Sequence, residues 1–103
     1  INGNWASSGG RNANSAGNPN YTLTLGTAAT VELNLMSSVD TYLYLKDTAG
    51  NVIASNDDGG AGYNSKIVKS LTAGTYTAVA ATYSSSQSGS FTMTTSHGGL
   101  LAD

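Results

Sequence analysis

Hydrophobic and polar residues alternate with a period of two along much of this chain, and this pattern is what most constrains its fold. Residues 21–25 (YTLTL) and 31–36 (VELNLM) alternate in this way. Because successive side chains of a β-strand point to opposite faces, each run predicts a strand with one buried face. The link from Gly26 to Thr30 is short, so we expect the two runs to form an antiparallel hairpin.

Residues 39–47 (VDTYLYLKD) carry large side chains on both faces of a further expected strand. Leu43 and Leu45 share one face, and Tyr42 and Tyr44 share the other. This pattern favours a central strand that is covered on both sides, since the tyrosine hydroxyl groups can still reach water.

Turn-forming residues follow this strand and recur along the rest of the chain. Asp47 and Gly50 are typical turn residues, and residues 52–55 (VIAS) are expected to return as the partner strand. Further strands are expected at 66–71, 75–83 and 90–96. Turn signals spaced by about 8 to 12 residues predict an all-β sandwich or jelly roll with about seven strands.

Residue composition limits both the domain organisation and the partners. The 103 residues fit one domain, and 10% charged residues together with 13 Gly suit strands joined by tight turns. Four cations and a net charge of -2 provide no basic surface for nucleic acid or for an anionic membrane, so we expect neither partner. Because the chain has no cysteine, it forms no disulfide and has no thiolate metal ligand.

Both ends of the chain lack the alternation of the middle. Residues 1–20 are rich in Gly and Asn and are expected to form an extra strand or a linker, whereas residues 21–96 form the sandwich. Trp5 argues against complete disorder, because a lone tryptophan usually covers a core or a binding surface. Residues 97–103 are expected to be a tail. Since neither Met nor a signal peptide precedes Ile1, we expect the chain to be a segment of a longer, exported protein.

An acidic, glycine-rich loop at residues 56–65 (NDDGGAGYNS) is the candidate metal site. If the 47–51 turn joins its two strands in simple register, Asp40 faces Asp57 or Asp58. Carboxylates this close repel one another unless a cation lies between them, and Ca²⁺ takes six to eight oxygen ligands. The candidate ligands of a calcium ion are Asp40, Asn56, Asp57, Asp58 and Asn64.

Two alternatives to the metal stay open for this loop. Asn and Asp followed by Gly are also typical of a solvated turn at the exit of a hairpin. Arg11 or Lys66 could instead neutralise the carboxylates by forming ion pairs with them.

Catalysis finds little support in the sequence, but ligand binding has candidates. His97 is the only histidine, so neither a Ser-His-Asp triad nor a multi-histidine zinc site is expected, and we predict a non-enzyme without catalytic residues. Aromatic side chains stack on sugars or on extended peptides. We therefore take Trp5 and Tyr63, together with Arg11, as candidate ligand-binding residues for polysaccharide or extended peptide.

Five motifs that occur in order within residues 37–96 resemble the bacterial pre-peptidase C-terminal domain. They are the strand DTYLYL (40–45), the turn DTAGN (47–51), the loop NDDG (56–59), the strand start AGTY (73–76) and the last strand SGSF (88–91). The hairpin expected at residues 21–36 fits the opening strands of that family. Residues 1–20 are not part of the family pattern.

The resemblance implies an antiparallel jelly-roll β-sandwich of seven or eight strands that has no catalytic activity of its own. Such domains are attached to secreted bacterial enzymes or surface proteins, and related modules in collagenases use calcium. We therefore expect an extracellular accessory module, partnered with catalytic or adhesin domains of the same chain, that aids substrate engagement, secretion or stability. A dedicated module for polysaccharide or collagen-like peptide and a structural spacer of an adhesin remain the alternatives.

Overall fold

The computed structural model describes residues 1–57 and 63–102. Within these residues the chain forms nine β-strands and no helix that is long and apolar enough to cross a membrane. The strands are β1 (Asn2–Trp5), β2 (Asn20–Leu25), β3 (Ala29–Met36), β4 (Thr41–Lys46), β5 (Val52–Asn56), β6 (Ser65–Leu71), β7 (Gly74–Thr82), β8 (Gly89–Thr95) and β9 (Leu100–Ala102). The predicted all-β class is confirmed.

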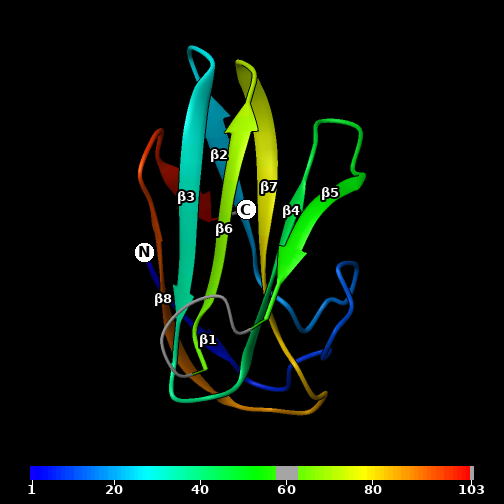
Figure 1. Cartoon of the computed structure of the whole chain (residues 1–103). Helices are drawn as coiled ribbons and strands as arrows, with labels where there is room; N and C mark the ends of the chain where they lie inside the picture. The colour runs from blue at the N-terminus through cyan, green and yellow to red at the C-terminus, as the bar shows by residue number, and fades with distance from the viewer. Residues whose placement is uncertain (58–62, 103) are drawn as a thin grey trace.

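The strands form two antiparallel sheets that face each other as a sandwich (Figure 1). One sheet has the order β1-β8-β3-β6, and the other has the order β5-β4-β7-β2-β9. The first eight strands therefore pair as β1 with β8, β2 with β7, β3 with β6 and β4 with β5, which is a jelly-roll arrangement. The predicted jelly-roll sandwich is confirmed, and β9 makes the strand count nine where seven or eight were expected.

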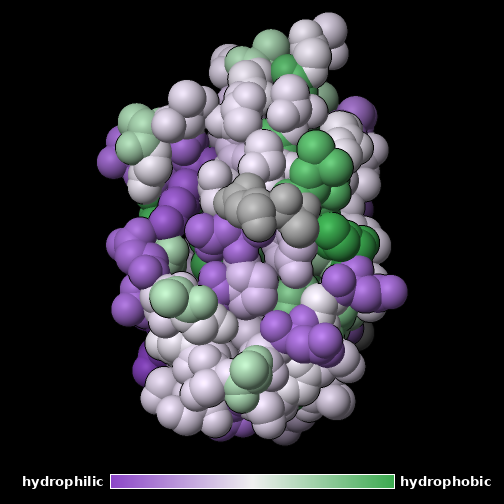
Figure 2. All heavy atoms as spheres, turned by 180° about the vertical axis from the view of Figure 1, so that it is seen from behind, coloured by the Kyte–Doolittle hydropathy of each residue, from purple (hydrophilic) through white to green (hydrophobic). Residues whose placement is uncertain are grey.

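The inner faces of the two sheets supply one hydrophobic core. Leu23, Leu33 and Leu43 come from three different strands, and none of them is exposed to solvent. The runs with period-two alternation therefore point their leucines inward, as expected. Figure 2 shows the molecule from the side opposite to Figure 1, and much of this face has the pale colours of intermediate hydropathy. A neutral surface of this kind agrees with the high Ser, Thr and Gly content.

The hairpin expected at residues 21–36 is wrong. β2 pairs with β7 and β9, whereas β3 pairs with β6 and β8 in the opposite sheet. The short link between β2 and β3 therefore crosses from one sheet to the other. Alternation defines which face of a strand is buried, but the two sheets bury their faces against the same core, so the pattern could not distinguish a hairpin from a crossing.

The β4–β5 hairpin forms as expected, but its register differs from the prediction. The register shifts between Leu45 and Lys46, which indicates a β-bulge next to the turn, and Leu43 then pairs with Asn56. Continued by one residue, this pairing brings Asp57 opposite Tyr42 and not opposite Asp40. The expected register, which placed Asp57 directly opposite Asp40, is therefore corrected, because the bulge adds a residue that the simple register did not count. The alternative partner, Asp58, lies outside the described residues.

Both chain ends contribute strands to the sandwich. β1 pairs with β8 at the edge of the four-stranded sheet, and β9 pairs with β2 at the edge of the five-stranded sheet. The expected tail at residues 97–103 is thus corrected, since Leu100–Ala102 is a strand. Between β1 and β2, residues 6–19 form a loop that contacts the connection between β7 and β8 through the isolated bridge of Gly9 with Ser85.

Trp5 links the two sheets at the end of β1. Its side chain is 2% exposed, and its ring centroid lies 4.5 Å from that of Phe91. The indole Nε1–H donates to the carbonyl oxygen of Ala80 in β7 at 2.9 Å, and the amide of Ala80 donates to Pro19. Because β2 begins at Asn20, the backbone of Ala80 lies at the end of the β2–β7 ladder, and Trp5 and Pro19 satisfy its polar groups in place of a strand.

We predict that Trp5→Ala lowers the free energy of unfolding by about 3 to 5 kcal/mol, because it leaves a cavity and a buried carbonyl without its donor. Urea denaturation measures this change. Val68→Ala is the matched control, since Val68 is 60% exposed, and it should cost well under about 1 kcal/mol. A Trp5→Ala protein as stable as the Val68→Ala protein would contradict the buried position of the indole.

Candidate functional site

Two groups of side chains stand out as candidate sites. One lies where β4 and β6 begin and consists of Thr41, Ser65 and the main-chain carbonyls of Asp57 and Tyr63. We call it the hydroxyl cluster. The other lies on the outer face of the five-stranded sheet and consists of Arg11, Tyr42, Tyr44 and Tyr83. We call it the tyrosine–arginine strip.

The hydroxyl cluster is built from oxygen atoms in close contact. The side chains of Thr41 and Ser65 are buried, and their hydroxyl oxygens lie 2.6 Å apart. Thr41 Oγ1 donates to the carbonyl of Tyr63 at 2.7 Å, and Ser65 Oγ donates to the carbonyl of Asp57. Each hydroxyl has one proton. The two hydroxyl protons therefore serve three contacts between oxygen atoms. The cluster consequently has more acceptor oxygens than hydroxyl donors.

The predicted metal ligands Asp40, Asn56 and Asp57 lie near the hydroxyl cluster in the sequence, and each makes its own contacts. The carboxylate oxygen Oδ1 of Asp40 is buried, and its main-chain carbonyl accepts from Tyr83 at 2.9 Å. Asp57 is half-buried and joins the cluster through its carbonyl. Asn56 ends β5. Asp58 lies outside the described residues, and within the described part no group of three or more Asp, Glu, His or Cys side chains gathers.

Asn64 and the two predicted rival cations have partners elsewhere. Asn64 Oδ1 accepts from the amide of Ser37 at 3.0 Å, so this oxygen already serves the backbone. Lys66 pairs with Glu32 at 2.6 Å across β6 and β3. Arg11 contacts Tyr83, as described below. Within the described residues each of these two cations thus has a partner outside the acidic loop, and neutralisation of that loop by Arg11 or Lys66 stays a prediction.

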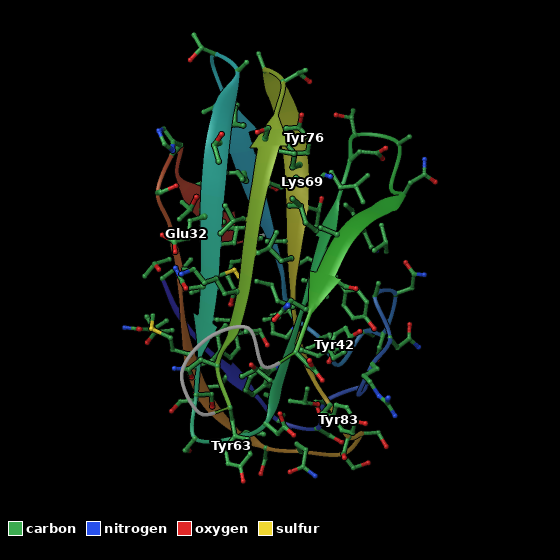
Figure 3. The ribbon with its side chains drawn as sticks, viewed as in Figure 1. Glu32, Tyr42, Tyr63, Lys69, Tyr76 and Tyr83 are labelled. Carbon is green, nitrogen blue, oxygen red and sulfur yellow. The ribbon has the colours of Figure 1, made fainter. Side chains whose placement is uncertain are left out.

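The candidate ligand-binding residues separate into one buried and two exposed side chains. Trp5 is 2% exposed and cannot present its ring to a ligand, so its predicted binding role is wrong. Its indole fills the core and bonds Ala80. Tyr63 is 58% exposed and lies at the end of the sandwich where β6 begins (Figure 3). Arg11 is also exposed.

The tyrosine–arginine strip holds Arg11 in a fixed position. The guanidinium carbon lies 4.1 Å from the centroid of the Tyr83 ring, and Nε–H donates to the Tyr83 carbonyl at 3.1 Å. Such stacking attracts the cation to the negative face of the ring. Figure 3 shows Tyr83 and Tyr42 on the same side of the molecule.

Tyr42 and Tyr44 continue the strip along β4. Their ring centroids are 4.9 Å apart, and both side chains are half-buried on the outer face. Burial raises the pKa of the Tyr44 phenol, and the neighbouring Tyr42 raises it further, while the positive charge of Arg11 lowers it. Arg11 therefore lies close enough to Tyr44 to influence the pKa of its phenol. The alternation of Tyr with Leu in DTYLYL was the signal for this outer position.

Two buried polar side chains hold the 6–19 loop that carries Arg11. Ser8 Oγ lies 2.5 Å from Thr82 Oγ1 and accepts from the amide of Gln87 at 3.0 Å. Asn18 is 3% exposed and bonds the loop backbone on both sides of Arg11. Its Oδ1 accepts from the Gly9 amide at 2.9 Å, and its Nδ2 donates to the carbonyls of residues 10 and 12 at 3.1 and 2.8 Å. Sequence reasoning missed both residues, because Ser and Asn are common in solvated loops.

Of the comparisons with known proteins, the one with solved structures supports the fold. No family model and no curated protein matches the sequence. Among solved structures, the chain is similar to the pre-peptidase C-terminal domain of collagenase from Bacillus anthracis, whose crystal structure was determined at 1.0 Å. The TM-score is 0.69 at 13% sequence identity, and the match covers 92% of this chain and 85% of that chain. The fold implied by the sequence motifs is therefore confirmed.

We predict that Asn18→Asp lowers the free energy of unfolding by about 1 to 3 kcal/mol, because a carboxylate cannot donate to the two loop carbonyls and a buried charge is left beside them. Urea denaturation at neutral pH measures the loss. Asn4→Asp is the control, since Asn4 is exposed on β1 and its replacement should change stability by less than about 0.5 kcal/mol. Equal stability of the two variants would show that Asn18 does not organise the loop.

Proposed function

We propose that this chain is a non-catalytic accessory module of a secreted bacterial protein, which aids substrate engagement, secretion or stability of the enzyme or adhesin to which it is joined. The observation that carries the proposal is the structural match to the pre-peptidase C-terminal domain of a collagenase over 92% of the chain. The five ordered motifs in residues 37–96 support the same family. The neutral surface suits an extracellular module.

A dedicated ligand-binding module is the second candidate, and a specific observation favours it over a mere spacer. The tyrosine–arginine strip exposes aromatic and guanidinium groups that are fixed on the outer face of a sheet, as a recognition surface for polysaccharide or extended peptide requires. A spacer that only separates domains has no need of such an arrangement.

Deletion of residues 1–103 from the parent protein tests the accessory role. We expect the deletion to leave kcat/KM on a small soluble substrate within about twofold of the wild type, because catalysis lies in another domain. The secreted yield, or activity on the insoluble substrate, should fall. Loss of activity on the soluble substrate, with the remaining domain still folded, would contradict a non-catalytic module.

We also propose that calcium binds beside the hydroxyl cluster, with Asp40, Asn56 and Asp57 as its ligands in the described part of the chain. The donors are all oxygen, which is the donor type that Ca²⁺ prefers. The buried oxygen of Asp40 and the excess of acceptors between Thr41 and Ser65 support the proposal. Bound calcium would offset the negative charge of the carboxylates.

Calcium at about 100 times its dissociation constant should stabilise the folded chain by about 2.7 kcal/mol, because an ion bound only by the folded state shifts unfolding by mass action. Thermal unfolding in excess calcium and in EDTA measures the difference. Asp40→Asn should remove most of it, whereas Glu32→Gln, which changes a carboxylate on the outer face of the other sheet, should not. An unchanged melting temperature in EDTA would refute the site.

A further inference from the structure

Arg11 has donor groups in place for a ligand. Its Nε–H is used by the carbonyl of Tyr83, and stacking on the Tyr83 ring fixes the plane of the guanidinium. Within the described residues, the terminal Nη atoms of Arg11 have no hydrogen-bond partner or ion pair. A guanidinium held in this way presents two parallel N–H donors, which match the two oxygens of a carboxylate. Because the fold already fixes the Arg11 side chain, a ligand that binds it loses little further conformational entropy there.

The backbone around Arg11 is fixed as well. Gly10 has a φ of +66°, and a Cβ at this position would lie 2.8 Å from the amide nitrogen of Ser85. Only glycine allows the loop to approach the β7–β8 connection so closely. Asn18 holds the same segment from inside. The guanidinium is therefore carried by a rigid support and not by a mobile linker.

A shallow hollow lies in front of this arginine. It measures about 630 Å³, which is large enough for a sugar ring. Its lining is Gly9, Gly10, Arg11, Tyr83, Ser84 and Ser85. The lining provides hydroxyl groups, backbone groups and one aromatic ring but no aliphatic side chain, so it suits a hydroxylated ligand better than an apolar one.

Two cations lie beside the aromatic rings of this face. Lys46 lies on the outer face of β4, two residues beyond Tyr44, and its Nζ donates to Asn14 of the 6–19 loop at 2.7 Å. Arg11 and Lys46 are two of the four cations of the chain. The rings of Tyr42 and Tyr44 lie along the same strand as Lys46. A ligand that lies along the strip therefore meets cations and aromatic surface in turn.

We propose that the tyrosine–arginine strip binds an acidic polysaccharide, a chain of uronic acid residues, with Arg11 paired to a sugar carboxylate and the tyrosines in contact with the sugar rings. Charge complementarity favours this ligand, because such a chain repeats a carboxylate on every ring, whereas a neutral glucan offers none. An apolar or proline-rich peptide would find no aliphatic side chain in the hollow. The proposal deepens the ligand-binding form of the proposed function and rests on it.

Affinity electrophoresis of the 103-residue chain in gels that contain polygalacturonate tests the proposal. EDTA is present throughout, so that calcium cannot bridge protein and polysaccharide. We expect retardation at low salt that weakens as salt is added, because exposed ion pairs are screened. Arg11→Gln should weaken binding at least about tenfold, since a charged hydrogen bond is lost. Lys69→Gln is the matched control, because it removes the same charge from the opposite sheet, and it should bind as the wild type does.

Two further gels separate the ligand classes. Dextran should not retard the chain, and poly-glutamate should retard it much less than polygalacturonate, because it offers carboxylates without sugar rings. Arg11→Lys keeps the charge but loses the paired donors, so it should restore binding only in part. Thermal unfolding confirms that each variant is folded.

The proposal is overturned if polygalacturonate does not retard the wild type at low salt, or if folded Arg11→Gln binds as the wild type does. Retardation by poly-glutamate equal to that by polygalacturonate would also overturn it, because the ligand would then be acidic peptide. None of these results tests the accessory role. That role is tested by deletion in the parent protein, and a chain without affinity for uronates could still support secretion or stability.

Discussion

The hydrogen bond from the indole of Trp5 to the carbonyl of Ala80 ties the two sheets together and directs the loop that follows β1. It joins β1 of one sheet to β7 of the other at the point where β2 has not yet begun. A buried tryptophan needs both apolar contact and an acceptor for its N–H, and Phe91 and Ala80 supply these from opposite sheets. The chain must therefore run from β1 toward β7. The 6–19 loop, which follows β1, consequently lies beside the end of β7.

The direction of that loop explains where a recognition surface can form. Ser8 bonds the end of β7 and the connection that follows it, and Asn18 closes the loop on itself from a buried position. Arg11 lies between these two anchors and is stacked on Tyr83. Jelly-roll pairing thus supplies a rigid sheet, and the loop adds a charged group to its outer face. The hydrogen bonds within the loop keep the guanidinium of Arg11 in one place.

Much of the fold, but little of the site, could be predicted from the sequence. Alternation identified the buried leucines and the β4–β5 hairpin, because burial is a local property of a half-buried strand. It could not assign strands to sheets, since both sheets face the same core. It also could not foresee the bulge beside Lys46, which changes the residue that lies opposite Asp57. Trp5 and Arg11 were recognised as unusual, but their partners lie more than 70 positions away in the sequence, where no local pattern reaches.

The 6–19 loop is a fixed part of the sandwich, and amide hydrogen exchange measured residue by residue tests this directly. The amide of Ser8 donates to Gln87 at 2.8 Å, that of Gly9 to Asn18 at 2.9 Å, and that of Ala80 to Pro19 at 2.9 Å. Protected amides open only when their hydrogen bonds break. We predict that Ser8, Gly9 and Ala80 exchange as slowly as Leu33, which is buried in β3, a strand that is paired on both sides. Exchange of Ser8, Gly9 and Ala80 at the rates of an unfolded chain, with Leu33 still protected, would show that the loop is not fixed.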